Sequence, residues 1–141
     1  MRCFFCARII IFLSFALDKQ KGQMAKHLTL GKLGEDVAVQ YLMEQGYEVL
    51  ERNWRNVHKE IDIIAKEGGE LVVVEVKTRK SDEYGQPDLA VTSRKQHLLV
   101  AAANAYLFKN GLDVNTRFDI VSILMKEEGP VIDHIKDAFL P

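Results

Sequence analysis

Apolar residues recur at two different spacings along the chain, and the helical spacing comes first. Between Thr29 and Gln45 apolar side chains repeat every three to four residues, and Gly46 follows as a natural helix stop. The stripe consists of Leu30, Leu33, Val37, Ala38, Tyr41 and Leu42. These positions predict a helix over residues 29–45 with one face turned toward a sheet.

A second helix is predicted from residue 92 or 93 to about Lys109. Thr92 or Ser93 can cap its start, and Gly111 can end it. Its buried stripe is expected to contain Leu98, Leu99, Ala102, Ala105 and Tyr106.

The other apolar runs have the length and composition of β-strands. They cover Tyr47–Trp54, Glu60–Ala65, Glu70–Thr78 and Arg117–Met125, with a short edge strand over Val131–Ile135 after the Gly129-Pro130 turn. A basic loop at residues 55–59 is expected between the first two strands. The polar segment from Arg79 to Ala90 is long enough to move over a substrate as a lid.

The Gly68-Gly69 pair predicts a tight hairpin turn, and this turn fixes a register. If Glu67 and Glu70 flank the turn, Asp62 lies directly opposite Glu75. The same register pairs Ile64 with Val73, and Glu60 with Lys77. Side chains alternate along a strand, so Glu75 and Lys77 point to the same face. A slip of one residue would move Asp62 to the other face.

Facing carboxylates repel each other, and this repulsion destabilises a sheet unless a cation lies between them. Oxygen ligands from Asp62 and Glu75 suit Mg²⁺ or Mn²⁺ better than zinc. Alternatively, Glu75 and Lys77 form an exposed polar pair on a half-buried strand. The apolar run Leu71–Val74 favours the first interpretation because it indicates burial on both faces of the strand.

Glu35 adds a third acid from the first helix. At about 100° per residue it lies within roughly 20° of Leu42, at the edge of the stripe that faces the sheet. Alternatively, it is a first-turn acid stabilised by the helix dipole. Gly31 and Gly34 lie on one side of the same helix, where they would allow close approach of another backbone or of a phosphate.

Overall charge does not indicate a nucleic-acid partner, because the formal net charge is −1. Attraction to phosphate would have to come from local clusters, each of which is also compatible with an ordinary solvated face. The clusters are Arg52, Arg55, His58 and Lys59; Lys77, Arg79 and Lys80; and Arg94 and Lys95, with Gln96 beside them in the first turn of the second helix.

Residues 1–23 differ in character from the rest of the chain. The apolar stretch from Cys3 to Leu17 is shorter than the roughly 20 residues of a membrane-spanning helix. It is read as a mis-assigned start upstream of Met24, with a signal or anchor segment as the alternative. Without residues 1–23 the formal net charge would change from −1 to −4. Residues 24–141 are expected to form a single domain, without stable membrane association if Met24 is the start.

Several motifs occur together in a recognisable order. They are Gly34-Glu35, Gly46-Tyr47, Arg52-Asn53-Trp54-Arg55, Glu60-Ile61-Asp62-Ile63-Ile64-Ala65, Val74-Glu75-Val76-Lys77-Thr78-Arg79 and Arg117-Phe118-Asp119-Ile120-Val121. Over about residues 30–123 the chain resembles the YraN family of small predicted endonucleases, within the PD-(D/E)xK nuclease superfamily and related to archaeal Holliday-junction resolvases. Lys59 departs from the pattern, since the family usually has Gly there.

This resemblance implies an α/β fold, with a mixed sheet and a restriction-endonuclease-like core in the order α-β-β-β-α-β. It implies that Asp62 and Glu75 hold Mg²⁺ or Mn²⁺, that Lys77 orients or activates the attacking water, and that Glu35 acts through a water of the metal. The contacts expected with nucleic acid come from Arg55, Lys59, Arg79, Arg94, Lys95 and Gln96.

The resulting hypothesis is a cytoplasmic, metal-dependent endonuclease acting on DNA, with branched or structured DNA as the substrate that the resolvase resemblance implies. A resolvase would need a homodimer to cut two strands symmetrically. The competing hypothesis is a nucleic-acid-binding module that keeps the nuclease fold without catalysis. Metal-dependent cleavage distinguishes the two.

Overall fold

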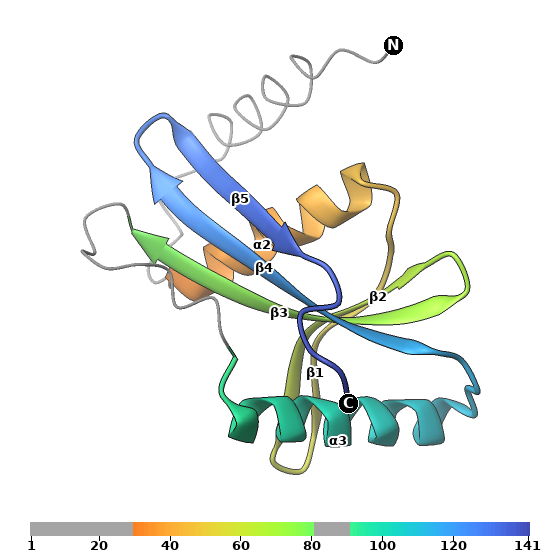
Figure 1. Cartoon of the computed structure of the whole chain (residues 1–141). Helices are drawn as coiled ribbons and strands as arrows, with labels where there is room; N and C mark the ends of the chain where they lie inside the picture. Colours follow the sequence, from red (N-terminus) through yellow and green to blue (C-terminus); the bar gives the residue numbers. More distant parts are fainter. Residues whose placement is uncertain (1–29, 81–90) are drawn as a thin grey trace, which may run out of the picture.

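The computed structural model describes residues 30–80 and 91–141, which form two helices and one sheet (Figure 1). In chain order the elements are α2 (Leu30–Glu44), β1 (Glu48–Asn56), β2 (Lys59–Glu67), β3 (Glu70–Lys80), α3 (Ser93–Asn110), β4 (Thr116–Lys126) and β5 (Gly129–Ile135). The expectations for residues 1–23, and for a lid that falls mostly on residues 81–90, lie outside the described residues.

The sheet has five strands in the order β1-β2-β3-β4-β5. β3 and β4 run parallel, and the other neighbouring strands run antiparallel. Helix α3 makes the crossover between the two parallel strands, as a parallel connection requires. The predicted mixed sheet and the element order α-β-β-β-α-β are therefore confirmed, and β5 completes the edge.

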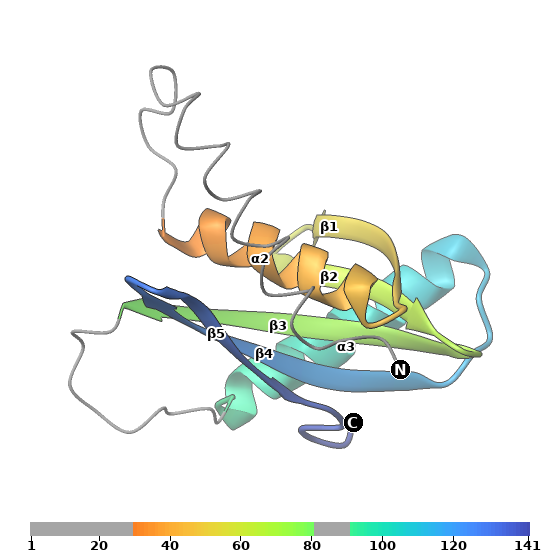
Figure 2. The same ribbon diagram turned by 90° about the horizontal axis from the view of Figure 1, so that it is seen from above.

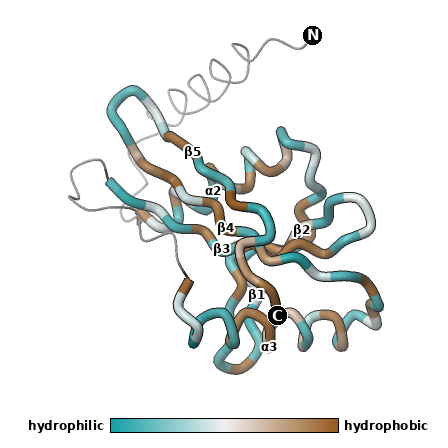
Figure 3. Tube along the Cα trace, viewed as in Figure 1, coloured by the Kyte–Doolittle hydropathy of each residue, from teal (hydrophilic) through white to brown (hydrophobic). Residues whose placement is uncertain are grey.

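The two helices cover opposite faces of the sheet, as Figure 2 shows most clearly. Against α2 the buried residues are Val37, Ala38, Leu42, Tyr47, Ile63, Ala65, Val72, Val74, Val121 and Ile123. Against α3 they are Trp54, Ile61, Ile64, Leu71, Val73, Val91, Leu99, Ala102, Ala103, Tyr106, Phe118 and Ile120. In Figure 3 hydrophobic stretches run along β4, whereas the β4–β5 turn is hydrophilic.

β3 is buried on both faces of the sheet. Val72 and Val74 pack on the α2 side, and Val73 packs on the α3 side. The burial of these valines on two faces, expected from their apolar run, is confirmed. Alternation then places Glu75 and Lys77 on the α3 side, in line with Val73.

The register of the β2–β3 hairpin agrees with the prediction where the strands are paired. Glu67 lies opposite Glu70, and Ile64 lies opposite Val73. Gly68 supplies the left-handed backbone of the turn with φ 59°. The pairing ends at Ile63 and Val74, so the expected pairs of Asp62 with Glu75 and of Glu60 with Lys77 are not part of the ladder, and Glu60 pairs with Arg55 of β1. Asp62 and Glu75 lie one step past the last paired residues.

Two expectations about element boundaries were wrong. Residues 55–59 are not a loop, because Asn56 pairs with Lys59 and only Val57 and His58 turn the chain. In this turn Val57 has the left-handed conformation, with φ 56°, and Lys59 does not have a positive φ that would require glycine. β5 starts at Gly129, before the expected position, because Pro130 already pairs with Met125.

The buried stripe of α3 also differs from the prediction. Leu98 is exposed and Ala105 is only partly buried, whereas Ala103 takes a buried place between Leu99 and Tyr106. The capping prediction is confirmed in detail. Thr92 accepts a hydrogen bond from the Lys95 amide, and Gly111 ends the helix with φ 61°.

Gly34 allows α2 to approach β3 closely. A Cβ atom at this position would lie 1.7 Å from Oγ1 of Thr78, whereas one at Gly31 would meet nothing within 4 Å. The expected close approach is thus found at Gly34, and the neighbour is a side chain of β3. This contact sets the start of α2 against the end of the strand that carries Glu75 and Lys77.

Candidate metal and catalytic site

The candidate site lies where β2 and β3 separate. β3 continues to Lys80 alongside β4, while β2 continues toward its start alongside β1. Past Val74, therefore, the β2-facing edge of β3 has lost its ladder partner. The amide of Val76 donates instead to Oδ2 of Asp62 at 2.8 Å. A carboxylate thus replaces the missing backbone acceptor and is held beside Glu75.

Asp62 lies in an environment that opposes its negative charge. Burial raises the pKa of Asp62 to about 6, and the nearby Glu75 carboxylate adds to this rise. The Val76 amide and the Lys95 ammonium act in the opposite direction. At neutral pH the folded protein therefore carries an ionised carboxylate at an unfavourable position, which a cation would stabilise.

Glu75 has one oxygen without a hydrogen-bond partner. Its side chain is 14% exposed, and its Oε2 atom is buried without any hydrogen bond. Nζ of Lys95 lies 3.1 Å from this oxygen, which is an ion-pair distance without hydrogen-bond geometry. Buried carboxylate oxygens normally accept a hydrogen bond, whereas this one has only the charge of the Lys95 ammonium beside it and keeps its lone pairs available to a cation.

Glu35 belongs to α2, on the face of the sheet opposite to α3, and is held near this site (Figure 2). Nδ2 of Asn53 donates to Oε2 of Glu35 at 2.9 Å, and the Glu35 charge contributes to the raised pKa of Asp62. The next residue, Asp36, forms an ion pair with Arg52. The described helix starts at Leu30 and has no acid in its first turn, so the alternative reading of Glu35 as a first-turn acid does not apply.

Asn53 was not singled out from the sequence, although it lay within a quoted motif. It has φ 50° and lies in β1 between the pairs Arg52–Ile63 and Trp54–Ile61. Asn tolerates this left-handed conformation better than most residues. A strand asparagine carries no sequence signal for this left-handed conformation, so the structure was needed to connect Asn53 with Glu35.

Asp62 and Glu75 provide the oxygen donors that a hard divalent cation requires. The unsatisfied Oε2 of Glu75 and the raised pKa of Asp62 both fit such a cation. Within residues 30–80 and 91–141, no group of three or more His, Cys, Asp or Glu side chains converges as a ready-made metal cluster. Glu35 is consequently not a third direct ligand in this arrangement.

The residues expected to contact nucleic acid lie in different parts of the structure. Lys77 and Arg79 are half-buried on β3, and Arg94 is exposed at the start of α3. Lys95 faces Glu75. Nε2 of Gln96 donates to the Val91 carbonyl oxygen at 2.8 Å, so this amide supports the helix start.

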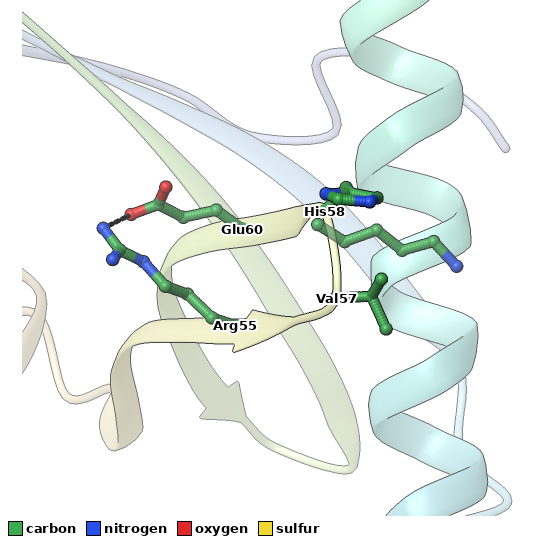
Figure 4. A pocket seen from close by; sticks show the side chains of 5 residues that line it. Arg55, Val57, His58 and Glu60 are labelled. Atoms are coloured by element: carbon green, nitrogen blue, oxygen red, sulfur yellow. Dashed lines mark hydrogen bonds and ion pairs between the residues drawn. The ribbon is translucent and has the colours of Figure 1, made fainter.

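Arg55 and Lys59 belong to the tip of the β1–β2 hairpin. There they line an open hollow of about 330 Å³ together with Val57, His58 and Glu60 (Figure 4). Arg55 pairs with Glu60 at 2.8 Å and remains largely exposed. Val57 projects into solvent with 87% of its surface exposed. The hydrogen bond with Glu60 raises the pKa of Arg55, and the charge of Glu35 adds to this rise, so this hairpin is within electrostatic range of Glu35.

A second charged cluster, centred on Asp119, was quoted as a motif but given no role from the sequence. Asp119 accepts two hydrogen bonds from Arg117 at 2.9 and 3.0 Å, one from Nε2 of His134 at 2.9 Å and one from the Asp137 amide at 3.0 Å. Burial alone would raise the pKa of Asp119, but His134 and Arg117 hold that pKa below its ordinary value.

This cluster lies on the α2 side of the sheet, because Asp119 alternates with Phe118 and Ile120, which pack toward α3. Arg117 also donates to the Tyr47 hydroxyl at 2.9 Å and pairs with Glu67 at 2.7 Å. The cluster is thus a satisfied network that joins β4 and β5 to the start of β1 and the end of β2.

Among the described residues, no helix combines the length and apolar character needed to cross a membrane.

The fold defines the class of protein: a mixed five-stranded sheet between two helices, with the order expected for a nuclease-like core. A family model described as "Uncharacterised protein family UPF0102" matches residues 34–123, and UPF0102 is the YraN family. The chain belongs to this family.

Related bacterial proteins support the assignment over most of their length. A "UPF0102 protein" from Phocaeicola vulgatus is 43% identical over 118 residues, which are 84% of this chain and 98% of the relative. A "UPF0102 protein" from Bacteroides thetaiotaomicron is 48% identical over 118 residues, with the same coverage of both chains. One from Christiangramia forsetii is 47% identical over 116 residues, which are 82% of this chain and 98% of the relative.

Proposed function

We propose that the protein is a divalent-metal-dependent endonuclease that hydrolyses phosphodiester bonds in DNA. The observation that carries this proposal is the buried Oε2 atom of Glu75, which lacks a hydrogen bond and lies beside Asp62 where β2 and β3 part. Asp62 and Glu75 would hold Mg²⁺ or Mn²⁺. When bound, such an ion supplies Lewis-acid stabilisation of the phosphate charge and lowers the pKa of water.

The protein's own groups would position the substrate. Lys77 shares the α3-side face of β3 with Glu75, so its ammonium would neutralise phosphate charge and orient the attacking water. Glu35, fixed by Asn53, would accept a hydrogen bond from a water at the edge of the site. Arg79 and Arg94 would contact neighbouring phosphates, which fix position without reading sequence.

A panel of linear, flap and four-way-junction DNA, incubated with Mg²⁺, Mn²⁺ or EDTA, tests the proposal. We expect Glu75→Ala and Lys77→Ala to reduce metal-dependent cleavage at least about a hundredfold, because metal-ion catalysis supplies several kcal/mol. The matched controls are Glu128→Ala in the β4–β5 turn and Lys126→Ala at the end of β4, which both change exposed residues. Cleavage by Glu75→Ala at the wild-type rate would exclude this site.

The non-catalytic alternative makes a different forecast in the same assay. A binding module would retain DNA binding in EDTA and cleave none of the substrates.

A bacterial DNA substrate is met in the cytoplasm, which is the location we propose. Symmetric cutting of a four-way junction would require two active sites in a homodimer. Sedimentation of the protein with and without junction DNA measures its oligomeric state.

A further inference from the structure

The Lys95 ammonium occupies a position at the candidate metal site. It reaches there from α3, outside the strand motif that contains Asp62, Glu75 and Lys77. Its Nζ atom lies 3.1 Å from Glu75 Oε2, the same oxygen that lacks a hydrogen bond. The placement thus makes Lys95 the cation that faces Glu75 in the described structure.

The backbone of Lys95 is fixed, while its side chain has room to leave. Oγ1 of Thr92 accepts from the Lys95 amide at 3.3 Å, and the Gln96 side chain donates to the Val91 carbonyl oxygen at 2.8 Å. These contacts anchor the first turn of α3 on both sides of Lys95. The Lys95 side chain is 38% exposed, so its ammonium can rotate toward solvent without unfolding the helix.

Two cations cannot both contact Glu75 Oε2 without repelling each other. Like charges within a few ångström disfavour one another, most strongly where water is partly excluded. Glu75 is mostly buried, and Asp62 is the second carboxylate beside it. A divalent cation bound by these two groups would therefore have to displace the Lys95 ammonium or bind more weakly in its presence.

We propose that Lys95 is a displaceable internal cation, which neutralises Glu75 in the metal-free protein and is expelled when a divalent cation binds. The proposal rests on the metal site of the proposed function and adds a competition to it. The expelled ammonium lies at the start of α3, where it can contact the phosphate of an incoming strand. Lys95 is thus a positioning residue that couples metal entry to phosphate binding.

Calorimetric titration with Mn²⁺ in the absence of DNA tests this competition. Relative to wild type, Lys95→Met should bind Mn²⁺ about fivefold more tightly, since partly exposed ion pairs shift equilibria by up to about this factor. Lys95→Arg keeps the charge and should stay close to wild type. Lys109→Met removes an exposed lysine from the last turn of the same helix and serves as the control.

A second measurement uses the unaltered protein, in case Lys95→Met does not fold. Side-chain NMR of lysine ammonium groups, with Lys95 assigned through Lys95→Arg, should show the Lys95 signal shift and become more mobile when Mg²⁺ is added. An unchanged signal at saturating Mg²⁺ would overturn the proposal.

The outcomes separate this proposal from the proposed function. Unchanged or weaker Mn²⁺ binding by Lys95→Met, with binding by wild type intact, overturns the competition and leaves the metal site standing. Tighter binding by Lys95→Met without DNA cleavage by wild type supports the competition and contradicts the nuclease. Absence of binding by both proteins overturns both.

Discussion

Asp62→Asn should stabilise the folded, metal-free protein while abolishing the proposed activity. The asparagine Oδ1 atom can still accept from the Val76 amide, so the link between β2 and β3 is kept. What disappears is the charge that burial and Glu75 disfavour. Such a trade between stability and activity is common where a site holds unfavourable charges together.

The magnitude follows from the pKa of Asp62, which burial and Glu75 raise from 3.8 to about 6. At about 1.36 kcal/mol per pH unit, keeping Asp62 ionised in the folded state costs about 3 kcal/mol at pH 8. Local relaxation and water reduce this, so we expect Asp62→Asn to gain about 1–3 kcal/mol in the free energy of unfolding.

The stability gained through Asp62→Asn depends on pH. Below the unfolded pKa of 3.8 the carboxyl is neutral in both states, and the advantage of asparagine vanishes. Between pH 4 and 6 the unfolded chain ionises first, so wild type progressively loses stability relative to the variant. Above about pH 6 the difference is complete.

Urea unfolding in EDTA at pH 4 and pH 8 measures this difference. Asp133→Asn, an exposed aspartate of β5, is the matched control and should change stability little at either pH. A variant that is no more stable than wild type at pH 8, or equally stabilised at both pH values, would refute the reasoning.

Three further predictions concern the scaffold, each checked by urea unfolding. Gly34→Ala should destabilise the protein by about 1–3 kcal/mol, because the new Cβ would clash with the neighbouring strand, whereas Gly31→Ala should be tolerated; equal effects would contradict this. Asp119→Ala should cost about 3–5 kcal/mol by leaving its buried partners unpaired, while exposed Asp113→Ala should cost little. Thr92→Ala should cost about 1 kcal/mol through loss of the helix cap, and an unchanged midpoint would argue against that cap.

The sequence predicted the fold and the main neighbours of the candidate site because local signals agreed with one another. Gly68-Gly69 predicted the hairpin register, which the structure shows from Glu67 and Glu70 to Ile63 and Val74, with Asp62 and Glu75 just past the last pair. The valine run predicted burial on both faces of β3. Turn chemistry and alternation are local properties of the chain, so no knowledge of distant contacts was needed.

Contacts between distant elements could not be predicted in this way. Lys95 was placed in a helix turn as a phosphate ligand, but its distance to Glu75 depends on how α3 crosses the sheet. The link from Asn53 to Glu35 needs a left-handed residue inside a strand, which no pattern of apolar positions indicates. The exposure of Leu98 likewise depends on the rotation of α3 about its axis.

The contacts of the Asp119 network in the core could not be predicted from the sequence either. His134 was not singled out from the sequence, yet its side chain is 5% exposed and hydrogen-bonded to Asp119. These two residues come from neighbouring strands, but Arg117 also reaches Tyr47 and Glu67 across the α2 side of the sheet. Only the folded arrangement of four strands brings these charges together.

The hydrogen bond from the Val76 amide to Asp62 gives the protein a built-in spectroscopic reporter. Most strand amides donate to backbone carbonyl oxygens, which do not titrate. The Val76 amide instead donates to a carboxylate, so its chemical shift and solvent exchange should follow both the protonation of Asp62 and its occupation by a metal. An unmodified backbone amide can therefore reveal the state of this site without any substrate being known.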